Sequence, residues 1–496
     1  MYESDLEQYV VEALKGVGFS YLPPEEQEAG RENSIQEVVL RRRLVEAVDR
    51  LNPNIPAEAR EQAVKEVLNL SSQNLIENNE AFYVFLTEGV PVEYRHADGT
   101  VRGDRVRLVD FAEPRNNDLV VTNQFSVLHK ETLKRPDVVL LVNGLPLVVL
   151  ELKNPEDEQA TVKKAFTQLQ NYKSFIPSLF VYNSVLVASD GYDTKAGSLT
   201  AGWSRFMAWK TVDGVREDPR TVPQIETLIR GLLRPDILLD MIRNFTVFAK
   251  EQQIDPESGL VSVGTVKMIA AYHQYHAVNK AIDSTLKAAA KDGDCKAGVV
   301  WHTQGSGKSL SMVFYAGRIV QALDNPTVVV VTDRNDLDDQ LFDTFAASKQ
   351  LLRQVPEQAR SRAHLKELLT TAGGGVYFTT IQKFSPADNG DRLDLLSDRK
   401  NIVVIADEAH RSHYGFAAHE IENEETGEMR TSYGFAKYLR DALPNVLVLP
   451  GRRSRRRTLL RRRCSATTST STTSSRRWRI RRRYASTMSH AWPRSI

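Results

Sequence analysis

Cysteine is almost absent from this 496-residue chain, which contains only Cys295 and Cys464. Two cysteines are too few for a disulfide framework or a zinc cluster, so the sequence predicts two unpaired thiols. Long apolar runs are missing as well, since none approaches the roughly 18 residues that a membrane-spanning helix needs. The first seven residues carry acids where a signal peptide would carry bases. We therefore expect a cytoplasmic protein with no membrane contact.

Acidic side chains are missing from residues 451–496, which hold 15 Arg and no Lys, Asp or Glu. The first 450 residues carry 50 basic and 63 acidic side chains, so the body of the protein is acidic. Any nucleic-acid binding by this body must come from a local groove rather than from overall charge. The tail itself shows no periodicity, and we expect it to be disordered.

The pattern of apolar residues predicts two α/β units. Residues 1–240 combine helices over 2–19, 33–51, 57–77 and 159–175 with strands from Ala81 onward and at 118–128, 138–142, 147–152 and 179–188. Asn33 or Ser34 is a candidate helix cap, and Asp98-Gly99 and Asn143-Gly144 are predicted hairpin turns. We expect a central sheet with flanking helices.

A connector over 241–264 separates this unit from a second one over 265–450. There, strands at 297–301, 327–332, 375–380 and 401–406 alternate with helices at 265–290, 308–323 and 336–346. Such alternation predicts a parallel sheet with crossover helices, as a nucleotide-binding lobe requires.

A glycine-rich loop links the first strand of this lobe to a helix. Residues 299–309 read Val-Val-Trp-His-Thr-Gln-Gly-Ser-Gly-Lys-Ser, a strand-loop-helix context typical of a phosphate-binding loop. Backbone amides at its glycines can approach phosphates, the lysine can reach the terminal ones, and the last serine can ligate Mg²⁺. His302 stands where the strict pattern has Gly, and the alternative is a chance glycine-rich turn. The predicted ATP contacts are Gln304, Gly305, Ser306, Gly307, Lys308 and Ser309.

Two carboxylates end another apolar strand about a hundred residues later, in Asp407-Glu408-Ala409-His410. Asp407 is expected to join the Mg²⁺ shell, and Glu408 to orient or deprotonate the attacking water. The alternative is an acidic loop without chemistry. This box beside the glycine-rich loop resembles superfamily 2 helicases and translocases, with a DEAH box and a P-loop. The resemblance implies that His410 couples hydrolysis to movement and that Gln274 reads the adenine edge, unless Gln274 is only a surface helix residue.

The first unit carries a second constellation, Asp137 followed by Glu151 and Lys153 in a D-x13-E-x-K pattern. Glu151 and Lys153 are two apart on a strand and share a face, and a hairpin can bring Asp137 alongside. Two carboxylates that bind Mg²⁺ and a lysine that activates water make a phosphodiesterase site. A strand edge without chemistry is the alternative.

Gln168 and Tyr172 lie four apart on the next predicted helix and therefore on one face, and together with the D-x13-E-x-K pattern they resemble RecB-like nucleases. In that family the pair supports DNA and the active site. A helix face that only packs on the sheet is the alternative.

A RecB-like nuclease followed by a superfamily 2 motor resembles the restriction (R) subunit of type I restriction-modification enzymes. The resemblance covers residues 1 to about 449 and implies an ATP- and Mg²⁺-dependent endonuclease and translocase that cleaves unmodified foreign double-stranded DNA. It also implies methyltransferase (M) and specificity (S) subunits as partners. Beyond residue 449 the family continues into a second RecA-like lobe, so we interpret residues 451–496 as the product of a reading-frame shift, or else as a basic arm that binds nucleic acid.

Two other functions fit the same residues. A non-enzymatic remnant that binds ATP or DNA would show neither ATPase nor nuclease activity. A helicase-nuclease of DNA repair would show both activities without a methyltransferase partner.

Overall fold

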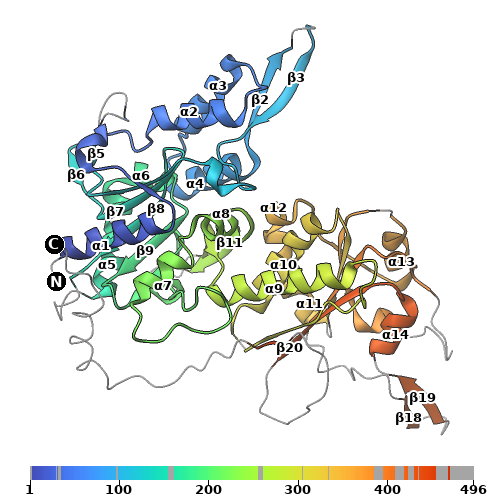
Figure 1. The fold of residues 1–496 in the computed structure, drawn as a ribbon. Coiled ribbons are helices and arrows are strands. Elements are labelled where there is room, and N and C mark those ends of the chain that lie inside the picture. The colour runs from blue at the N-terminus through green and yellow to red at the C-terminus, as the bar shows by residue number, and fades with distance from the viewer. Residues whose placement is uncertain are drawn as a thin grey trace.

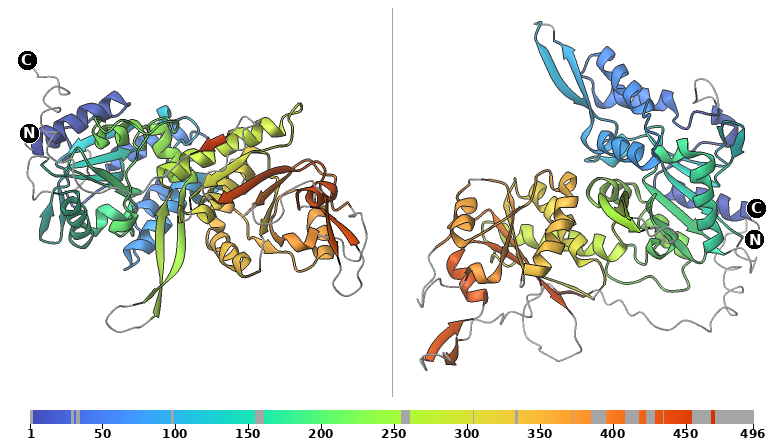
Figure 2. Two further views of the ribbon diagram at one scale, coloured as in Figure 1. Left: turned by 90° about the horizontal axis from the view of Figure 1, so that it is seen from below. Right: turned by 180° about the vertical axis from the view of Figure 1, so that it is seen from behind.

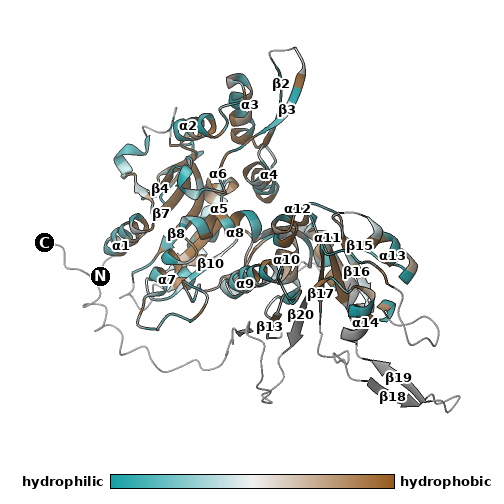
Figure 3. Ribbon diagram, turned by 45° about the vertical axis from the view of Figure 1, so that its right-hand side comes forward, coloured by the Kyte–Doolittle hydropathy of each residue, from teal (hydrophilic) through white to brown (hydrophobic). Residues whose placement is uncertain are grey.

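The computed structural model describes most of the chain. The described residues are 3–28, 31, 35–96, 99–154, 161–254, 261–303, 305–332, 335–371, 373–384, 395–407, 418–422, 429–433, 435–453 and 467–469. They form two α/β units that lie side by side in Figure 1. Apolar residues concentrate on the strands inside each unit, whereas outer helices such as α13 (Arg362–Thr370) are largely hydrophilic (Figure 3).

The first unit is built on a mixed six-stranded sheet. Its order is β1-β4-β7-β8-β9-β10. The two central strands are buried at every position, because helices and loops cover both faces. The strands are β1 Ser20–Tyr21, β4 Leu119–Asn123, β7 Val138–Val142, β8 Leu145–Leu152, β9 Val185–Ser189 and β10 Thr194–Gly197.

Strands β7 and β8 form the predicted antiparallel hairpin. Asn143 and Gly144 both have positive φ, 51° and 77°, as a two-residue turn of this kind requires. The Asn143 side chain donates to Leu108 O at 2.8 Å and accepts from Asp118 N at 2.7 Å, which satisfies a fully buried amide. The turn thereby fixes the register that aligns Asp137 with Glu151.

Helices cover this sheet and extend into an arm. Helices α1 (Glu3–Gly16), α5 (Val162–Phe175) and α6 (Pro177–Val181) pack on it, and β5 (Val127–His129) and β6 (Thr132–Lys134) form a small hairpin at its edge. The arm, at the top of Figure 1, contains α2, α3, α4 and the hairpin β2–β3. Its elements are α2 Arg41–Leu51, α3 Ala57–Leu68, α4 Leu75–Glu88, β2 Val90–Arg95 and β3 Val101–Val106.

Several predicted elements of the first unit were wrong. The helix predicted over 57–77 is interrupted, and the strands predicted from Ala81 begin only at Val90, because α4 occupies that aromatic-rich stretch. Asn74 caps α4 by accepting from Ile76 N, and Phe82, Tyr83 and Leu86 are buried at helical spacing, so tertiary packing overrides strand propensity.

Three other predicted elements have different bounds. The helix predicted from residue 33 begins at Arg41, and Asn33 and Ser34 lie outside the described residues, as does Asp98 of the predicted hairpin turn. The strand predicted over 118–128 is broken after Asn123, where Gln124 has a φ of 51°. The strand predicted over 179–188 begins at Val185, because the α6 helix occupies its first residues.

Helices α7 (Gln224–Arg230) and α8 (Pro235–Asn244) lead into a long antiparallel ribbon, β11 (Thr246–Ile254) with β12 (Val261–Ile269). The ribbon projects from the body in the left view of Figure 2. Apart from Phe245, the described residues of the predicted connector therefore belong to α8 and the ribbon. The helix predicted from 265 begins only at Tyr272, because pairing with β11 extends β12 to Ile269.

Lys267 on β12 is 2% exposed and fastens the ribbon to the first unit. Its Nζ donates to Asn79 Oδ1 at 2.9 Å and to Asn183 O at 2.7 Å. Burial lowers the pKa of Lys267 to about 7. The buried amine is thus accommodated by these two acceptors.

The second unit contains the predicted parallel sheet. Its order is β15-β16-β14-β17-β20-β13-β21, and every adjacent pair is parallel. The strands are β13 Val299–His302, β14 Thr327–Thr332, β15 Glu357–Gln358, β16 Val376–Thr380, β17 Ile402–Ala406, β20 Leu447–Arg453 and β21 Thr467–Ser469, with β18 Ala418–Glu422 and β19 Met429–Tyr433 as a separate hairpin. Helices α9 (Tyr272–Ala289), α10 (Lys308–Ala322), α11 (Asn335–Ala347), α12 (Lys349–Leu352), α13 and α14 (Phe435–Ala442) accompany them.

The tail differs from the prediction at two points that the structure describes. Strand β20 continues to Arg453, and residues 467–469 form β21, which pairs with β13. An open strand edge accepts a further strand readily, and threonine favours extended backbone. The rest of the tail lies outside the described residues.

The two units touch through α9. Trp209 of the first unit packs against Tyr275 with ring centroids 5.7 Å apart, and the hydroxyl of Tyr272 donates to Glu217 at 3.0 Å. Among the described residues, no helix combines the length and the apolarity that crossing a membrane requires.

Candidate active sites

Asp137 and Glu151 lie together where the two central strands of the first sheet, β7 and β8, meet at one end of their hairpin. Val138 on β7 pairs with Leu150 on β8, so the two carboxylates are neighbours across the hairpin. Leu152 N donates to Asp137 Oδ2 at 2.7 Å, which orients that carboxylate. Glu151 is 0% exposed and Asp137 is 6% exposed. The predicted cluster therefore exists, and it is buried.

Lys153 completes the predicted constellation. Its Nζ lies 2.8 Å from Glu151 Oε1, 3.1 Å from Glu3 Oε1 and 2.8 Å from Leu152 O. The ammonium group is thus held between two carboxylates and a carbonyl. Burial is the largest single effect and lowers the pKa of Lys153, but Glu151, Asp137 and Glu3 together outweigh it, so the pKa of Lys153 is raised.

Glu3 is a site residue that sequence reasoning missed. Glu3, Asp137 and Glu151 each offer one carboxylate oxygen, and these oxygens all lie within 4.8 Å of one another. Glu3 begins α1 and lies 134 positions before Asp137 in the chain, so no local pattern connects them. An acid at the start of an amphipathic helix was the only signal, and acids there are common.

The pKa values of Asp137 and Glu151 are both raised. Burial raises the pKa of Asp137 to about 7, although the hydrogen bond from the Leu152 amide and the charge of Lys153 partly offset this effect. Burial and then the nearby Asp137 charge raise the pKa of Glu151 to about 9. The Glu151 Oε2 atom is buried without a hydrogen-bond partner among the described residues. Oxygen ligands of this kind fit a divalent cation, whose charge would favour the ionised forms.

Gln168 and Tyr172 lie on α5, on the face that packs against β8 and β9. Gln168 Nε2 donates to the Tyr172 hydroxyl at 2.7 Å. Burial and then the charge of Glu151 raise the pKa of Tyr172. The structure therefore brings this predicted pair to the edge of the acidic cluster.

Glu7, one turn after Glu3, was also missed. Its carboxylate accepts from Gln124 Nε2 at 2.9 Å and from Asn123 Nδ2 at 3.2 Å. Gln124 N in turn donates to Asp137 O at 2.9 Å. Glu7 therefore stabilises the turn that holds the backbone of Asp137.

The glycine-rich loop joins β13 to α10 as predicted. Gly305 and Gly307 have φ values of 78° and 74°, which only glycine adopts readily, and Gly307 caps α10. Lys308 opens that helix and Ser309, which is exposed, follows it. Gln304 lies outside the described residues. The arrangement provides a helix N-terminus, whose backbone amides and positive dipole end suit an anion.

Gln274 lies against the glycine-rich loop. Its Nε2 donates to Gly307 O at 3.0 Å, and its Oε1 accepts from Ala271 N at 2.9 Å. His273 Nε2 lies 3.1 Å from Ser306 O. The start of α9 therefore contacts the loop at two consecutive residues.

Asp407 directly follows β17, and Asp407 N donates to Val331 O at 2.9 Å on the neighbouring strand β14. Because all strands of this sheet are parallel, Asp407 and the glycine-rich loop meet at the same carboxyl edge. Glu408 and His410 lie outside the described residues.

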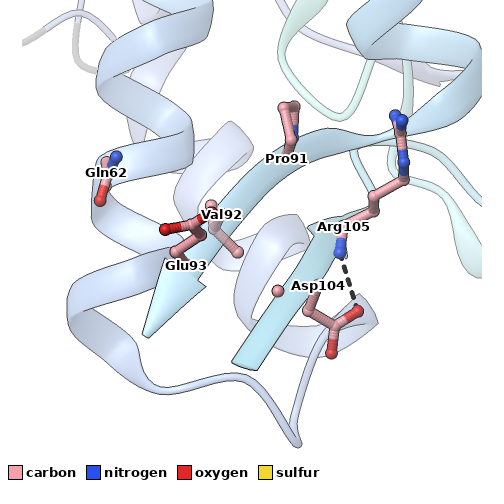
Figure 4. A pocket seen from close by; sticks show the side chains of 7 residues that line it. Gln62, Pro91, Val92, Glu93, Asp104 and Arg105 are labelled. Atoms are coloured by element: carbon pink, nitrogen blue, oxygen red, sulfur yellow. Dashed lines mark hydrogen bonds between the residues drawn. The ribbon is translucent and has the colours of Figure 1, made fainter. Parts of the chain in front are cut away.

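A surface hollow lies elsewhere, on the arm. Figure 4 shows it between α3 and the β2–β3 hairpin, where Gly103 stands opposite Glu93 and leaves space. None of the predicted site residues lines this hollow. It is lined by Gln62, Pro91, Val92, Glu93, Gly103, Asp104 and Arg105.

Comparison with known proteins matches both units. Residues 1–205 match the family of type I restriction enzyme R protein N termini, and residues 273–450 match the SWI2/SNF2 ATPase family. The type I restriction enzyme HindI endonuclease subunit of Haemophilus influenzae is 45% identical over 89% of this chain and 41% of its own length. The relatives of this chain are type I restriction endonuclease subunits.

Two further relatives agree. The putative type I restriction enzyme MjaIXP endonuclease subunit of Methanocaldococcus jannaschii is 35% identical over 84% of this chain and 41% of its own length. The type I restriction enzyme SsaAORF53P endonuclease subunit of Staphylococcus saprophyticus is 30% identical over 60% of this chain and 30% of its own length. These findings confirm the resemblance to R subunits that the motifs predicted. The chain spans about two fifths of the length of the first two relatives.

Proposed function

We propose that residues 1–240 form a RecB-like nuclease domain that hydrolyses phosphodiester bonds of double-stranded DNA. The observation that carries the proposal is the cluster of the buried Asp137 and Glu151 with the partly exposed Glu3, and with Lys153 at its side. In the whole R subunit this centre would cleave unmodified foreign DNA. A purely structural cluster would not need two buried carboxylates, Asp137 and Glu151, each of which raises the cost of ionising the other.

Each residue of this centre is proposed to have its own role in hydrolysis. Glu3, Asp137 and Glu151 would hold Mg²⁺, which when bound polarises the scissile phosphate and lowers the pKa of a water ligand. Lys153 is placed to orient the attacking water and to stabilise negative charge on the phosphate. Tyr172, oriented by Gln168, supports the cluster from α5.

Residues 265–450 are proposed to be the first RecA-like lobe of a superfamily 2 motor that binds ATP with Mg²⁺. The loop between β13 and α10 would cradle the phosphates, with Lys308 at the terminal ones. Ser309 and Asp407 would complete the Mg²⁺ shell, Glu408 would orient water, and His410 would couple hydrolysis to movement. Gln304 and Gln274 would contact the nucleotide, Gln274 from its place beside Gly307.

The partners proposed are M and S subunits, with double-stranded DNA as substrate. This rests on the relatives, whose names describe endonuclease subunits of type I restriction enzymes. ATP-driven translocation is proposed for the whole R subunit, of which a second lobe would form part.

We also propose that residues 451–496 arise from a reading-frame shift near residue 449. Their excess of Arg without acids and the end of the ATPase match at residue 450 support this. Sequencing the gene tests it: a downstream frame that continues the similarity to R subunits is expected, and its absence contradicts the shift.

The experiment for the function is plasmid cleavage with Mg²⁺, by the chain alone and with cognate M and S subunits and ATP. Cleavage that disappears in Lys153→Ala supports the nuclease, and cleavage by the chain alone that persists in Lys308→Ala shows that the centre works without the nucleotide site. Absence of cleavage under every condition contradicts the proposed function.

A further inference from the structure

His302, the last residue of β13, occupies a costly position. It is 3% exposed, and both ring nitrogens are buried with no hydrogen-bond partner among the described residues. A buried polar group without a partner has lost its water and gained nothing in return. The residue that directly precedes the glycine-rich loop is therefore a buried histidine whose ring nitrogens form no hydrogen bond within the described part of the chain.

The neighbours of His302 connect it to that loop. Its ring packs edge-to-face on the ring of His273, with centroids 5.6 Å apart and an interplanar angle of 78°. His273 Nε2 lies 3.1 Å from Ser306 O, inside the loop. The two histidines therefore contact each other, and His273 also contacts the loop at Ser306.

The imidazole of His302 is neutral at physiological pH. Burial, followed by the charges of His273 and Lys308, lowers the pKa of His302 to about 4. A neutral ring has one nitrogen that donates and one that accepts, so it can pair with a backbone amide or carbonyl.

We propose that His302 is a positioning residue for the nucleotide site, whose imidazole pairs with the glycine-rich loop only when the loop holds a nucleoside triphosphate. The inference rests on the proposed function, because it assumes that this loop binds ATP. It accounts for an unpaired buried ring at the one position where the loop departs from the strict glycine pattern. Strain of this kind is retained where it is relieved by a ligand.

The decisive variant is His302→Leu, which keeps a buried side chain of similar size and removes both unpaired nitrogens. The proposal predicts that the nucleotide-free protein melts at the same or a higher temperature, since the unpaired group is gone. It also predicts that the dissociation constant for fluorescent mant-ATP with Mg²⁺ rises about tenfold, the effect of one lost hydrogen bond. An affinity within twofold of the wild type overturns the proposal.

A second variant separates hydrogen bonding from shape. His302→Gln retains a donor and an acceptor, so its mant-ATP affinity should lie closer to that of the wild type than the affinity of His302→Leu. Equal losses in the two variants contradict a positioning role through hydrogen bonds. Because His302 and His273 act as a pair, the loss of mant-ATP affinity in the double variant should be smaller than the sum of the losses in His302→Leu and His273→Leu.

Two controls keep this result distinct from the proposed function. Ser178→Ala removes a different buried polar group without a partner among the described residues, the hydroxyl of Ser178 on α6 of the first unit, and should leave nucleotide affinity unchanged. Lys308→Ala should abolish binding. If the wild type does not bind mant-ATP, the proposed nucleotide site fails and this inference with it, whereas normal binding by wild type and His302→Leu overturns the inference alone.

Discussion

Lys153 Nζ lies 2.8 Å from Glu151 Oε1, and the same ammonium group lies 3.1 Å from Glu3 Oε1 at the start of the chain. One lysine thereby links the first helix to the central hairpin of the six-stranded sheet. The contact places a third carboxylate beside the two that the motif predicts. This third acid makes the cluster a plausible cation site in chemical terms, with three oxygen donors and one charge-stabilising amine.

Glu3→Gln should lower Mg²⁺-dependent DNA cleavage by more than about tenfold, because the variant removes one proposed ligand charge. The matched control is Glu12→Gln on the same helix, where Glu12 is exposed and pairs only with Lys15 among the contacts described. Cleavage rates measured across Mg²⁺ concentrations check the prediction. Equal rates in wild type and Glu3→Gln would remove Glu3 from the site.

The contribution of Glu151 to the stability of the metal-free protein should fall as the pH rises from about 4.5 to about 9. In the folded state the pKa of Glu151 is about 9, raised first by burial and then by Asp137, whereas the unfolded chain ionises near 4.5. The unfolded state thus loses its proton first, and alkaline pH favours unfolding. Thermal melts of Glu151→Gln should depend less on pH and lie higher than wild type at pH 8; a steeper dependence in the variant would refute this.

Lys267 predicts the opposite trend at higher pH. Burial lowers the pKa of Lys267 in the folded protein to about 7, whereas the unfolded chain titrates near 10.5. Burial of the charged amine is therefore costly below pH 7, and this cost disappears as the pH rises to 10.5. Lys267→Met also removes the hydrogen bonds to Asn79 and Asn183. The variant should therefore lose stability relative to wild type as the pH rises from 7 to 10 in chemical denaturation. A constant difference would show that the amine does not titrate there.

Gly307→Ala should weaken nucleotide binding more than Gly305→Ala does. Both positions have positive φ, which costs a non-glycine residue about 1 kcal/mol or more. A Cβ at Gly307 would also lie 2.7 Å from Gln274 Nε2, whereas a Cβ at Gly305 would meet nothing within 4 Å. Titration with mant-ATP distinguishes them, and equal losses would mean that the Gln274 contact is unimportant.

The sequence predicted well what local chemistry determines. Asn143-Gly144 specifies its own turn, and the turn sets the register that joins Asp137 to Glu151. Glu3 could not be predicted, because its place depends on the packing of α1 against β8 across the whole domain. The α4 helix was missed for a related reason: its aromatic residues favour strands in isolation and become helical through burial.

The central claim is that Glu3, Asp137 and Glu151 hold a divalent cation. Electron paramagnetic resonance of Mn²⁺, titrated with the nucleotide-free chain, tests it most directly, with Mg²⁺ as competitor. The account predicts one site in the wild type, displaced by Mg²⁺, whose affinity falls about tenfold or more in Glu151→Gln and is unchanged in Glu12→Gln. Equal Mn²⁺ binding by wild type and Glu151→Gln would contradict it.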